Sequence, residues 1–395
     1  MARALMVSSS FLPGRGGIES YLANLCEEMT PHLAVLAPRK RDGRTIPSDL
    51  QYPTAGYEGT MLVPNARIAN AIVKEAARRS VTKVLFGTPW PLVMLGPRLR
   101  RAGISYSVIV HGAELLVPSV IPGLRTRLAQ ALSDADLLLA VSDFTRSKLR
   151  FFLESADKRV PPIDLLRARV DLEHFHPQRA DVSLKHRLGL QADQPFVLVF
   201  GRLVPRKGTH RLIDAADALA ERHPGVAIVV AGTGPEEKKL QRRAADSKAR
   251  IIFTGRVPDD EAPSFYATAN VFALPVADRW FGLDVEGLGV VLLEAGAAGT
   301  PCVTGRSGGT PEAVVHKKTG FVVDARDQEA LVDRISSLLE DAEQASLMGT
   351  AGRSFVAEGF SNRPLPDSLL TWLELEPGKE QNAEHEATEE EDGWN

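Results

Sequence analysis

Short runs of apolar residues alternate along the chain with longer stretches whose apolar residues recur at helical spacing. The apolar runs lie at Ala4–Val7, Val84–Phe86, Tyr106–Val110, Leu137–Val141, Phe196–Phe200, Val226–Ala231, Ile251–Phe253, Val271–Leu274 and Phe321–Val323. The helical patterns cover Glu19–Met29, Arg125–Leu132, Arg211–Glu221, Glu237–Ala245, Val290–Ala298 and Glu329–Leu339. Continuous apolar strands that alternate with helices are typical of parallel sheets covered on both faces. The pattern therefore predicts an α/β fold.

This alternation begins twice. A strand, a glycine-bearing loop and a helix open the chain at residues 4–29, and the same order returns at residues 196–221 after a polar connector at 169–194. We therefore predict two Rossmann-like, doubly wound parallel-sheet domains that face each other across a cleft. The predicted parts are a first domain at 1–178, a second at 179–360, a crossover helix at 361–376 and an acidic, disordered tail at 377–395.

Composition narrows the class of protein. The formal net charge is −3, which argues against a nucleic-acid partner. Two cysteines are too few for a disulfide framework and suggest a reducing, cytoplasmic location. No apolar run approaches the roughly 18 residues of a membrane-spanning helix, and the first ten residues fit a strand better than a signal peptide. We expect a protein that is not integral to a membrane.

Candidate chemistry follows the strands, because ligands of open α/β sheets bind beyond the carboxyl ends of the strands. Arg202, Arg206 and Lys207 come directly after the strand Phe196–Phe200. Arginine can bind two phosphate oxygens at once, and lysine acts as a point charge. The alternative is an ordinary solvated loop, and we expect Arg206 itself to face solvent.

Two carboxylates flank a glycine-spaced turn further along the chain. Gly287 and Gly289 place Glu286 in a turn and predict that the next helix begins near Val290. Glu294 then lies inside an apolar helix, where burial of a carboxylate is costly without a partner. Ligand contacts and a structural salt bridge both explain such residues, and this pattern alone does not separate them.

Further loops at strand ends carry glycines or a histidine. Gly16 and Gly17 precede a helix and would let an anion approach its free N–H groups. His111 follows the strand Tyr106–Val110 and suits either a ligand contact or a structural hydrogen bond. We interpret Gly232 and Gly234 as a tight turn, since a lone Gly-x-Gly is a weak nucleotide signal.

Several motifs together resemble a known enzyme family. They are Gly201–Gly208, the Glu286 to Glu294 spacing, Gly16–Glu19, Val141–Thr145 and Ser307–Glu312. These segments resemble family 4 of the retaining glycosyltransferases, which have the two-domain GT-B architecture. Within that family, residues 282–295 are most similar to bacterial phosphatidylinositol mannosyltransferases that use GDP-mannose.

The resemblance implies roles for individual residues. The first domain would bind the acceptor and the second the nucleotide sugar. The implied catalytic residues are His111, Arg202, Lys207 and Glu286, and the implied donor-binding residues are Gly16, Gly17, Arg202, Lys207, Arg256, Val257, Glu286, Gly287, Leu288, Gly289 and Glu294. Arg202 and Lys207 would bind the diphosphate, Glu286 the sugar hydroxyls and Glu294 the ribose. Arg256 and Val257 would lie near the base, and His111 near the reacting sugar.

The implied reaction transfers a hexose, with mannose from GDP-mannose as the leading donor, onto a phosphatidylinositol mannoside or related lipid. It needs no cofactor and no metal, because fixed cations neutralise the leaving diphosphate. Basic residues of the first domain could hold an anionic membrane and place the protein at the inner face of the plasma membrane. They are Arg39, Lys40, Arg41, Arg44, Arg78, Arg79, Arg98, Arg100 and Arg101.

Alternatives remain open at this point. A UDP-sugar-dependent enzyme of the same family could act on another glycolipid, a polysaccharide or a small molecule. A non-catalytic GT-B-like binding protein is a second class, and a nicotinamide oxidoreductase is disfavoured by the missing fingerprint. One departure from the family also stands out: the family often has Pro-x-Gly-Val-Asp where this chain has Arg169 in the glycine position. That difference leaves acceptor identity open.

Overall fold

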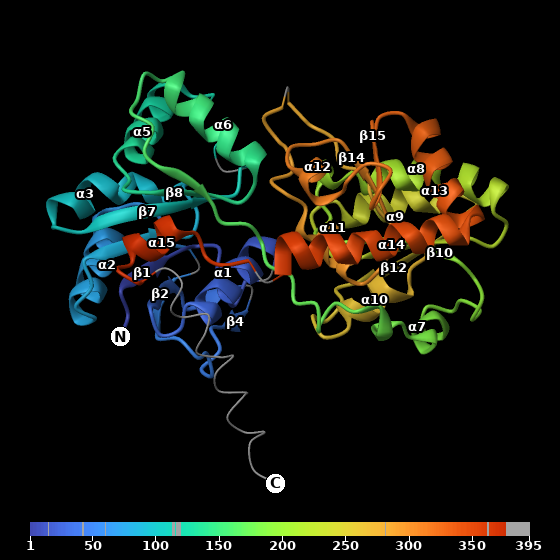
Figure 1. Cartoon of the computed structure of the whole chain (residues 1–395), viewed down its shortest axis with the longest axis horizontal. Helices are drawn as coiled ribbons and strands as arrows, with labels where there is room; N and C mark the ends of the chain where they lie inside the picture. Colours follow the sequence, from blue (N-terminus) through green and yellow to red (C-terminus); the bar gives the residue numbers. More distant parts are fainter. Residues whose placement is uncertain are drawn as a thin grey trace, which may run out of the picture. The chain divides into compact units, whose positions relative to one another are not determined.

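The computed structural model describes residues 1–14, 16–41, 43–59, 61–112, 115, 120–280, 282–361 and 363–376. The chain forms two compact units. Unit 1 comprises Met1–Arg167 together with the chain from Pro364 onward, and unit 2 comprises Ala168–Arg363 (Figure 1). The tail predicted at 377–395 lies outside the described residues.

Unit 1 is built on a seven-stranded parallel sheet in the order β5-β2-β1-β6-β7-β8-β9. Its strands are β1 (Ala4–Val7), β2 (Leu33–Pro38), β5 (Thr54–Tyr57), β6 (Lys83–Phe86), β7 (Ser105–Val110), β8 (Leu138–Ala140) and β9 (Ile163–Leu165), and β3 (Lys40–Arg41) pairs with β4 (Arg44–Thr45) in a separate hairpin. Its helices are α1 (Gly17–Glu28), α2 (Ala66–Arg78), η1 (Leu92–Leu95), α3 (Gly96–Arg101), α5 (Pro122–Ser133), α6 (Asp143–Glu154) and α15 (Asp367–Trp372).

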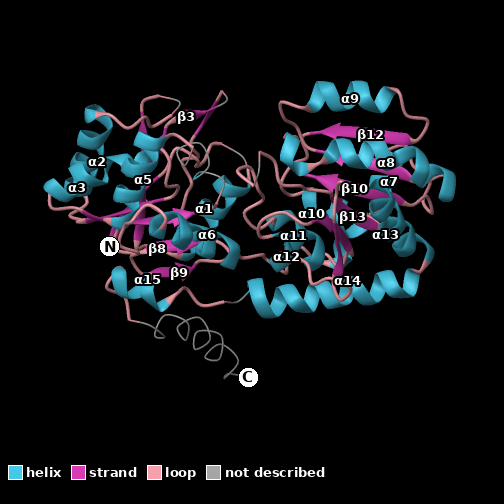
Figure 2. Ribbon diagram, turned by 90° about the horizontal axis from the view of Figure 1, so that it is seen from above, coloured by secondary structure: helices cyan, strands magenta, loops and turns pink. Residues whose placement is uncertain are grey.

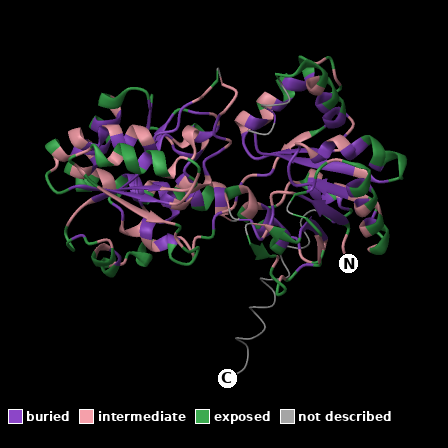
Figure 3. Ribbon diagram, turned by 180° about the vertical axis from the view of Figure 1, so that it is seen from behind, coloured by how far each residue is buried: buried purple, intermediate pink, exposed green. Residues whose placement is uncertain are grey.

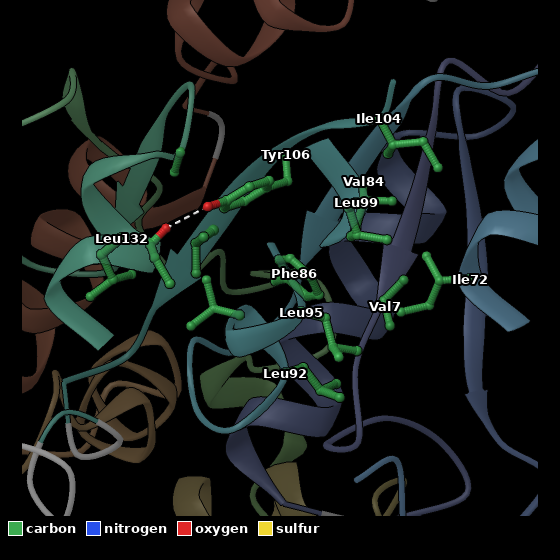
Figure 4. Packing of buried hydrophobic residues seen from close by; sticks show 14 of the residues in the cluster. Val7, Ile72, Val84, Phe86, Leu92, Leu95, Leu99, Ile104, Tyr106 and Leu132 are labelled. Atoms are coloured by element: carbon green, nitrogen blue, oxygen red, sulfur yellow. Dashed lines mark hydrogen bonds between the residues drawn. The ribbon is translucent and has the colours of Figure 1, made fainter. Parts of the chain in front are cut away.

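Alternate residues of these strands face two separate cores, as the period of two in a strand requires. One core packs the sheet against α2, α3, α5 and α6, and the other packs it against α1 and α15. Figure 4 shows part of the first core, where Phe86 and Leu99 pack near Tyr106. The Tyr106 hydroxyl donates to the carbonyl oxygen of Ala131 at 2.7 Å, so the one polar group of this aromatic side chain is satisfied in the core.

Unit 2 has a six-stranded parallel sheet in the order β12-β11-β10-β13-β14-β15. Its strands are β10 (Phe196–Phe200), β11 (Ala227–Ala231), β12 (Arg250–Gly255), β13 (Val271–Leu274), β14 (Cys302–Gly305) and β15 (Gly320–Val323). Its helices are η3 (Pro177–Arg179), α7 (Val182–Arg187), η4 (Pro205–Lys207), α8 (Thr209–Arg222), α9 (Glu237–Ala245), α10 (Ala262–Thr268), α11 (Val290–Ala297), α12 (Thr310–Ala313), α13 (Gln328–Glu340), α14 (Ala342–Val356) and η5 (Ala357–Ser361). Helices α8, α9 and α13 contribute to one core of the sheet, and α14 packs along α11 (Figure 2).

Both sheets share one strand order. In each unit the first strand lies in the middle, the second and third extend to one side, and the remaining strands extend to the other. The order therefore reverses between β1 and β6 in unit 1 and between β10 and β13 in unit 2. Most central-strand residues are buried in both units (Figure 3), as near-continuous apolar runs require. The prediction of two doubly wound parallel-sheet domains is confirmed.

The units divide at different residues from the predicted domain ends. Residues 168–178, which the sequence assigned to the first domain, belong to unit 2. The backbone N–H of Val170 donates to Phe360 O, and Arg353 donates to Leu172 O and Phe175 O. The predicted crossover segment contains α15, whose Leu369 and Leu370 are buried in a core of unit 1.

Candidate active site

The strand-order reversal of unit 2 lies between the loops that follow β10 and β13. The first loop ends at Gly208, which has a left-handed backbone with φ +72°. A Cβ atom there would lie 1.8 Å from the carbonyl oxygen of Pro275, the residue after β13. Only glycine allows this approach without a backbone shift, so the two loops are held together at the position where ligands of such folds bind.

A series of alternating charges joins these loops. Lys207 Nζ lies 3.1 Å from Glu286 Oε2, and Arg206 Nε lies 3.3 Å from the same oxygen. The Arg206 guanidinium also lies 3.9 Å from Asp284 Oδ1, and Arg279 lies 3.4 Å from Asp284 Oδ2. Glu286 is buried, so its two cations are the main source of charge compensation in a region with little solvent.

These cations decide the ionisation of Glu286. Burial on its own would raise the pKa of this carboxyl, because the charged form loses hydration. Lys207 and then Arg206 oppose that effect and outweigh it, so the pKa of Glu286 is lowered from its usual value. The site thus holds a carboxylate that stays ionised at neutral pH.

The backbone around Glu286 is anchored from the loop after β14. Its N–H donates to Ser307 Oγ at 3.2 Å, and its carbonyl oxygen accepts from the N–H of Gly309 at 3.0 Å. A Cβ at Gly308 would lie 1.9 Å from the Glu286 carbonyl oxygen, so glycine is required there too. Gly289, at φ +85°, precedes α11. The prediction of a turn at Glu286 and a helix from Val290 is confirmed.

Glu294 lies in α11, as predicted, and has a partner that the sequence pattern did not reveal. The hydroxyl of the fully buried Tyr266, from α10, donates to Glu294 Oε2 at 2.6 Å. Burial raises the pKa of Glu294, and the Tyr266 hydrogen bond and nearby Lys207 only partly oppose that rise. The surroundings therefore lower the pKa of Glu286 and raise that of Glu294.

The remaining predicted residues of unit 2 lie outside this charge network. Arg202 and Arg256 are exposed, and among the described residues the Arg202 side chain has no hydrogen-bond or ion-pair partner. Val257 follows β12 and is partly exposed. Cβ atoms at Gly232 and Gly234 would lie 2.0 Å and 2.3 Å from the carbonyl oxygens of Gly201 and Leu203. This close packing requires glycine at both positions.

In unit 1, His111 follows β7, the strand next to β6. Its Nε2 lies 2.9 Å from the carbonyl oxygen of Gly87, which follows β6. A carbonyl only accepts, so Nε2 carries a proton and donates. The imidazole also packs edge-to-face on Tyr21 at 5.3 Å, and the Tyr21 hydroxyl donates to Leu166 O at 2.7 Å. His111 is thus held in one ring orientation at the end of β7.

The glycine loop of unit 1 leads into α1. Gly16 is the residue before the helix and has no capping side chain, and Gly17 is exposed, with open space within 4 Å of the position that a Cβ would take. Glu19 lies in the first turn, where a carboxylate is favourable, and it pairs with Arg41 at 3.3 Å. The region therefore already contains one anion and its counterion.

Two further expectations can be placed on the structure. Arg169, the departure from the family loop, donates to the carbonyl oxygen of Arg363 at 2.7 Å within unit 2. Across the described part of the chain, no group of three or more His, Cys, Asp or Glu side chains is arranged to hold a metal ion.

The expectation that Arg206 faces solvent is wrong, because its guanidinium pairs with Glu286 and Asp284. The missed signal was a pair of carboxylates, Asp284 and Glu286, that need cations when they are buried. Tyr266 was also missed. It lies in a helix with no motif of its own, and only the fold brings it to Glu294.

Comparisons with known proteins agree with this fold and site. Residues 183–355 match the family described as glycosyl transferases group 1. A GDP-mannose-dependent alpha-(1-6)-phosphatidylinositol monomannoside mannosyltransferase of Mycolicibacterium smegmatis is 38% identical over 91% of this chain and 95% of its own length. A monoacylated phosphatidylinositol monomannoside mannosyltransferase of Corynebacterium glutamicum is 32% identical over 95% of this chain and 98% of its own length.

Solved structures show the same architecture at low identity. Anabaena HepE in complex with UDP has a TM-score of 0.74 and 21% identity, over 98% of this chain and all of that chain. A sucrose-phosphate synthase from Thermosynechococcus elongatus has a TM-score of 0.74 and 20% identity, over 91% and 94% of the two chains. Both the GT-B architecture and the enzyme class predicted from the sequence are confirmed: the chain belongs to the group 1 glycosyltransferase family, alongside GDP-mannose-dependent phosphatidylinositol monomannoside mannosyltransferases.

Proposed function

We propose that this protein transfers mannose from GDP-mannose, with retention of configuration, onto a hydroxyl of a phosphatidylinositol mannoside. The observation that carries the proposal is the similarity to enzymes of that name along nearly the whole chain. The ionised, cation-paired Glu286 at the strand-order reversal of unit 2 is consistent with it.

In this proposal the donor binds at the carboxyl ends of the strands of unit 2. Lys207 and Arg202 neutralise the diphosphate, and Lys207 is supplied from a loop whose Gly208 locks it against Pro275. Glu286 accepts hydrogen bonds from sugar hydroxyls, and Glu294 accepts from the ribose. The backbone from Gly287 to Gly289 approaches the donor closely, and Arg256 and Val257 lie beside the base.

The chemical step breaks the bond between the anomeric carbon and the diphosphate oxygen and forms a bond from that carbon to the acceptor oxygen. The acceptor proton passes to an oxygen of the departing diphosphate. His111 contacts the reacting sugar, with its ring orientation set by Gly87 O. Gly16 and Gly17 offer backbone N–H groups at the start of α1.

Transfer of radiolabelled mannose tests the proposal directly. We expect wild-type protein to convert GDP-mannose and phosphatidylinositol monomannoside into a larger glycolipid, and to use UDP-glucose poorly. Efficient use of UDP-glucose would replace the donor assignment. Absence of both binding and hydrolysis for every nucleotide sugar would favour a non-catalytic binding protein.

The same proposal assigns no metal to the reaction, because cationic side chains stabilise the charge that develops on the leaving diphosphate. Transfer should therefore continue at the same rate after dialysis against EDTA. A loss of activity that Mg²⁺ or Mn²⁺ restores would contradict this assignment.

We also propose that unit 1 binds an anionic membrane at the inner face of the plasma membrane. In the described part of the chain, no helix is both long and apolar enough to cross a bilayer. Five of the nine basic residues considered in the sequence already pair with carboxylates, namely Arg39, Arg41, Arg78, Arg79 and Arg100. The membrane contact therefore falls to Lys40 and Arg44 of the β3–β4 hairpin, with Arg98 and Arg101 of α3.

Vesicle flotation checks that contact. Wild-type protein should float with vesicles that contain phosphatidylinositol and remain in solution with pure phosphatidylcholine. The double variant Lys40→Glu and Arg44→Glu should lose flotation and keep its use of GDP-mannose with a detergent-solubilised acceptor. Unchanged flotation of this variant would exclude the hairpin.

A further inference from the structure

We propose that Arg206 is a positioning residue of the donor site, which holds the Glu286 carboxylate in place and balances its charge while Lys207 binds the donor diphosphate. The inference rests on the proposed function, which assigns the diphosphate to Lys207 and sugar hydroxyls to Glu286. Arg206 would act through Glu286 and would not itself contact the donor.

The geometry around Glu286 favours separate roles for Arg206, which holds Glu286, and Lys207, which binds the diphosphate. Lys207 and Arg206 both approach Oε2, at 3.1 Å and 3.3 Å, and both come from the short helix η4. Arg206 has a second anchor, the Asp284 carboxylate at 3.9 Å, which Arg279 contacts from its other oxygen. In the described chain, the only ion pair of Lys207 is the one with Glu286. Arg206 is thus fixed from two sides, whereas Lys207 needs to break only its pair with Glu286 in order to move.

Electrostatics explains why a second cation is needed. A diphosphate near Lys207 competes with Glu286 for the same ammonium group. If Lys207 were the sole partner, donor binding would leave a buried carboxylate uncompensated, which is strongly unfavourable. Arg206 removes that conflict, because its charge remains beside Glu286 when Lys207 turns to phosphate.

Arginine also suits the position better than lysine would. Its planar guanidinium presents several N–H groups in fixed directions, so it can contact Glu286 and Asp284 at once. Its backbone carbonyl accepts from the N–H of Ala277 at 3.4 Å, which ties η4 to the loop after β13. Any residue at position 206 would supply this carbonyl, so the part that needs arginine is the side-chain contact with Glu286 and Asp284.

The groups that face Glu286 define the expected pH response. They are Lys207 and Arg206 from η4, Asp284 from the same loop and the Ser307 hydroxyl from the loop after β14. Removal of Arg206 deletes one of two cations that keep the pKa of Glu286 low. The pKa of Glu286 then rises, so this carboxylate becomes protonated at a higher pH than in the wild-type protein.

The test compares Arg206→Met and Arg206→Lys with the control Arg222→Met, which removes an exposed arginine that pairs with Asp333. For Arg206→Met we expect kcat/KM for GDP-mannose to fall about 10-fold or more. In the plot of kcat/KM against pH, the acid limb should move up by about one pH unit. Affinity for GDP should also fall, because its diphosphate draws Lys207 from Glu286, but it should fall less than affinity for GDP-mannose, whose sugar needs the positioned carboxylate. Arg206→Lys should restore part of the rate and of the pH profile, and Arg222→Met should match wild type.

Two results would overturn the inference. An unshifted acid limb in both Arg206 variants would mean that Arg206 does not act through Glu286. An equal loss of affinity for GDP and GDP-mannose would mean that Arg206 does not position Glu286 for the sugar. If Arg206→Met does not fold, Arg206→Lys carries the same comparison of GDP with GDP-mannose. Failure of the proposed function is separate, because wild-type protein would then fail to bind GDP-mannose at all.

Discussion

The two units have the same strand order and differ sharply in the chemistry at the carboxyl ends of their middle strands. In unit 2 the loops after β10 and β13 bring the partly exposed Lys207 and Arg206 onto the buried Glu286. In unit 1 the loops after β6 and β7 join through a hydrogen bond from His111 to Gly87 O. One topology therefore carries a carboxylate shared by two cations in unit 2 and a histidine fixed by a carbonyl oxygen and an aromatic ring in unit 1.

The difference shows that topology sets where a site can form and that side chains decide what it can bind. A cation that shares a carboxylate with a second cation can exchange it for the phosphates of an anionic ligand. An imidazole between a carbonyl and an aromatic ring is suited to hold a neutral group in a fixed orientation. This contrast is consistent with a donor site in unit 2 and an acceptor site in unit 1.

The largest expected effect comes from replacing Lys207, the residue proposed to bind the donor diphosphate. Lys207→Met should lower kcat/KM for GDP-mannose by about 100-fold or more, because loss of one charged contact to the transition state costs about 2.7–4 kcal/mol. Initial rates of mannose transfer, measured over a range of donor concentrations, check this expectation.

Lys318→Met is the matched control for that measurement. Lys318 is an exposed lysine of unit 2 with no ion pair among the described residues. Its variant should transfer mannose at the wild-type rate. If Lys207→Met had unchanged donor kinetics, the proposed donor-binding role of Lys207 would be wrong, and the contrast between the two units would no longer hold.

A smaller effect should separate two glycines that look alike in sequence. Gly208→Ala places a Cβ 1.8 Å from Pro275 O at a backbone with φ +72°, so we expect a loss of at least about 2 kcal/mol in the free energy of unfolding. Gly17→Ala meets no atom within 4 Å at the start of α1 and should leave that free energy unchanged or slightly raised. Urea unfolding of the two variants checks the difference.

The donor kinetics of Gly17→Ala test whether this glycine contacts the donor. If the backbone at Gly17 approaches the donor, a methyl group there should raise the donor KM while the protein remains as stable as wild type. Unchanged donor kinetics would show that unit 1 uses this loop only to begin α1, and the proposed backbone contact would be wrong.

The sequence predicted much of the fold because its central strands are nearly continuous apolar runs. Ala4–Val7, Phe196–Phe200 and Val271–Leu274 were placed at the residues where the structure has them, and so was the helix Glu237–Ala245. The edge strand β5 was not predicted. Its residues Thr54–Tyr57 are all partly exposed, and its alternation is too weak to distinguish it from a loop.

The site was predictable to the extent that it follows the strand ends. Glu286 and Lys207 were identified because both lie in loops after parallel strands, and the fold brings such loops together. The roles of Arg206 and Tyr266 were not predictable, since each depends on a partner far away in sequence. Arg206 comes from the loop whose Gly208 packs on Pro275, and no local sequence pattern encodes its contact with Glu286.

The smallest expected effect compares one tyrosine hydroxyl in each unit. Tyr266→Phe removes the hydrogen bond to Glu294, and Tyr21→Phe removes the one to Leu166 O. A hydrogen bond to a neutral group contributes about 1 kcal/mol, and one to a charged group about 1.5–3 kcal/mol. Tyr21→Phe should therefore cost about 1 kcal/mol at every pH, since its partner does not titrate.

Tyr266→Phe should instead cost more as the pH rises, because its partner does titrate. The pKa of Glu294 is raised in the folded protein, so the stability that this group contributes falls as the pH increases from the usual glutamate value through the raised one. The Tyr266 hydroxyl favours the ionised form, and its removal raises the pKa of Glu294 further. The cost in unfolding free energy should grow from about 1 kcal/mol at pH 4.5 to about 2 kcal/mol at pH 8. Urea unfolding at pH 4.5 and pH 8 measures both losses in unfolding free energy. If the two variants lost the same amount at both pH values, Tyr266 would not affect the ionisation of Glu294, and the charge contrast between the units would rest on Glu286 alone.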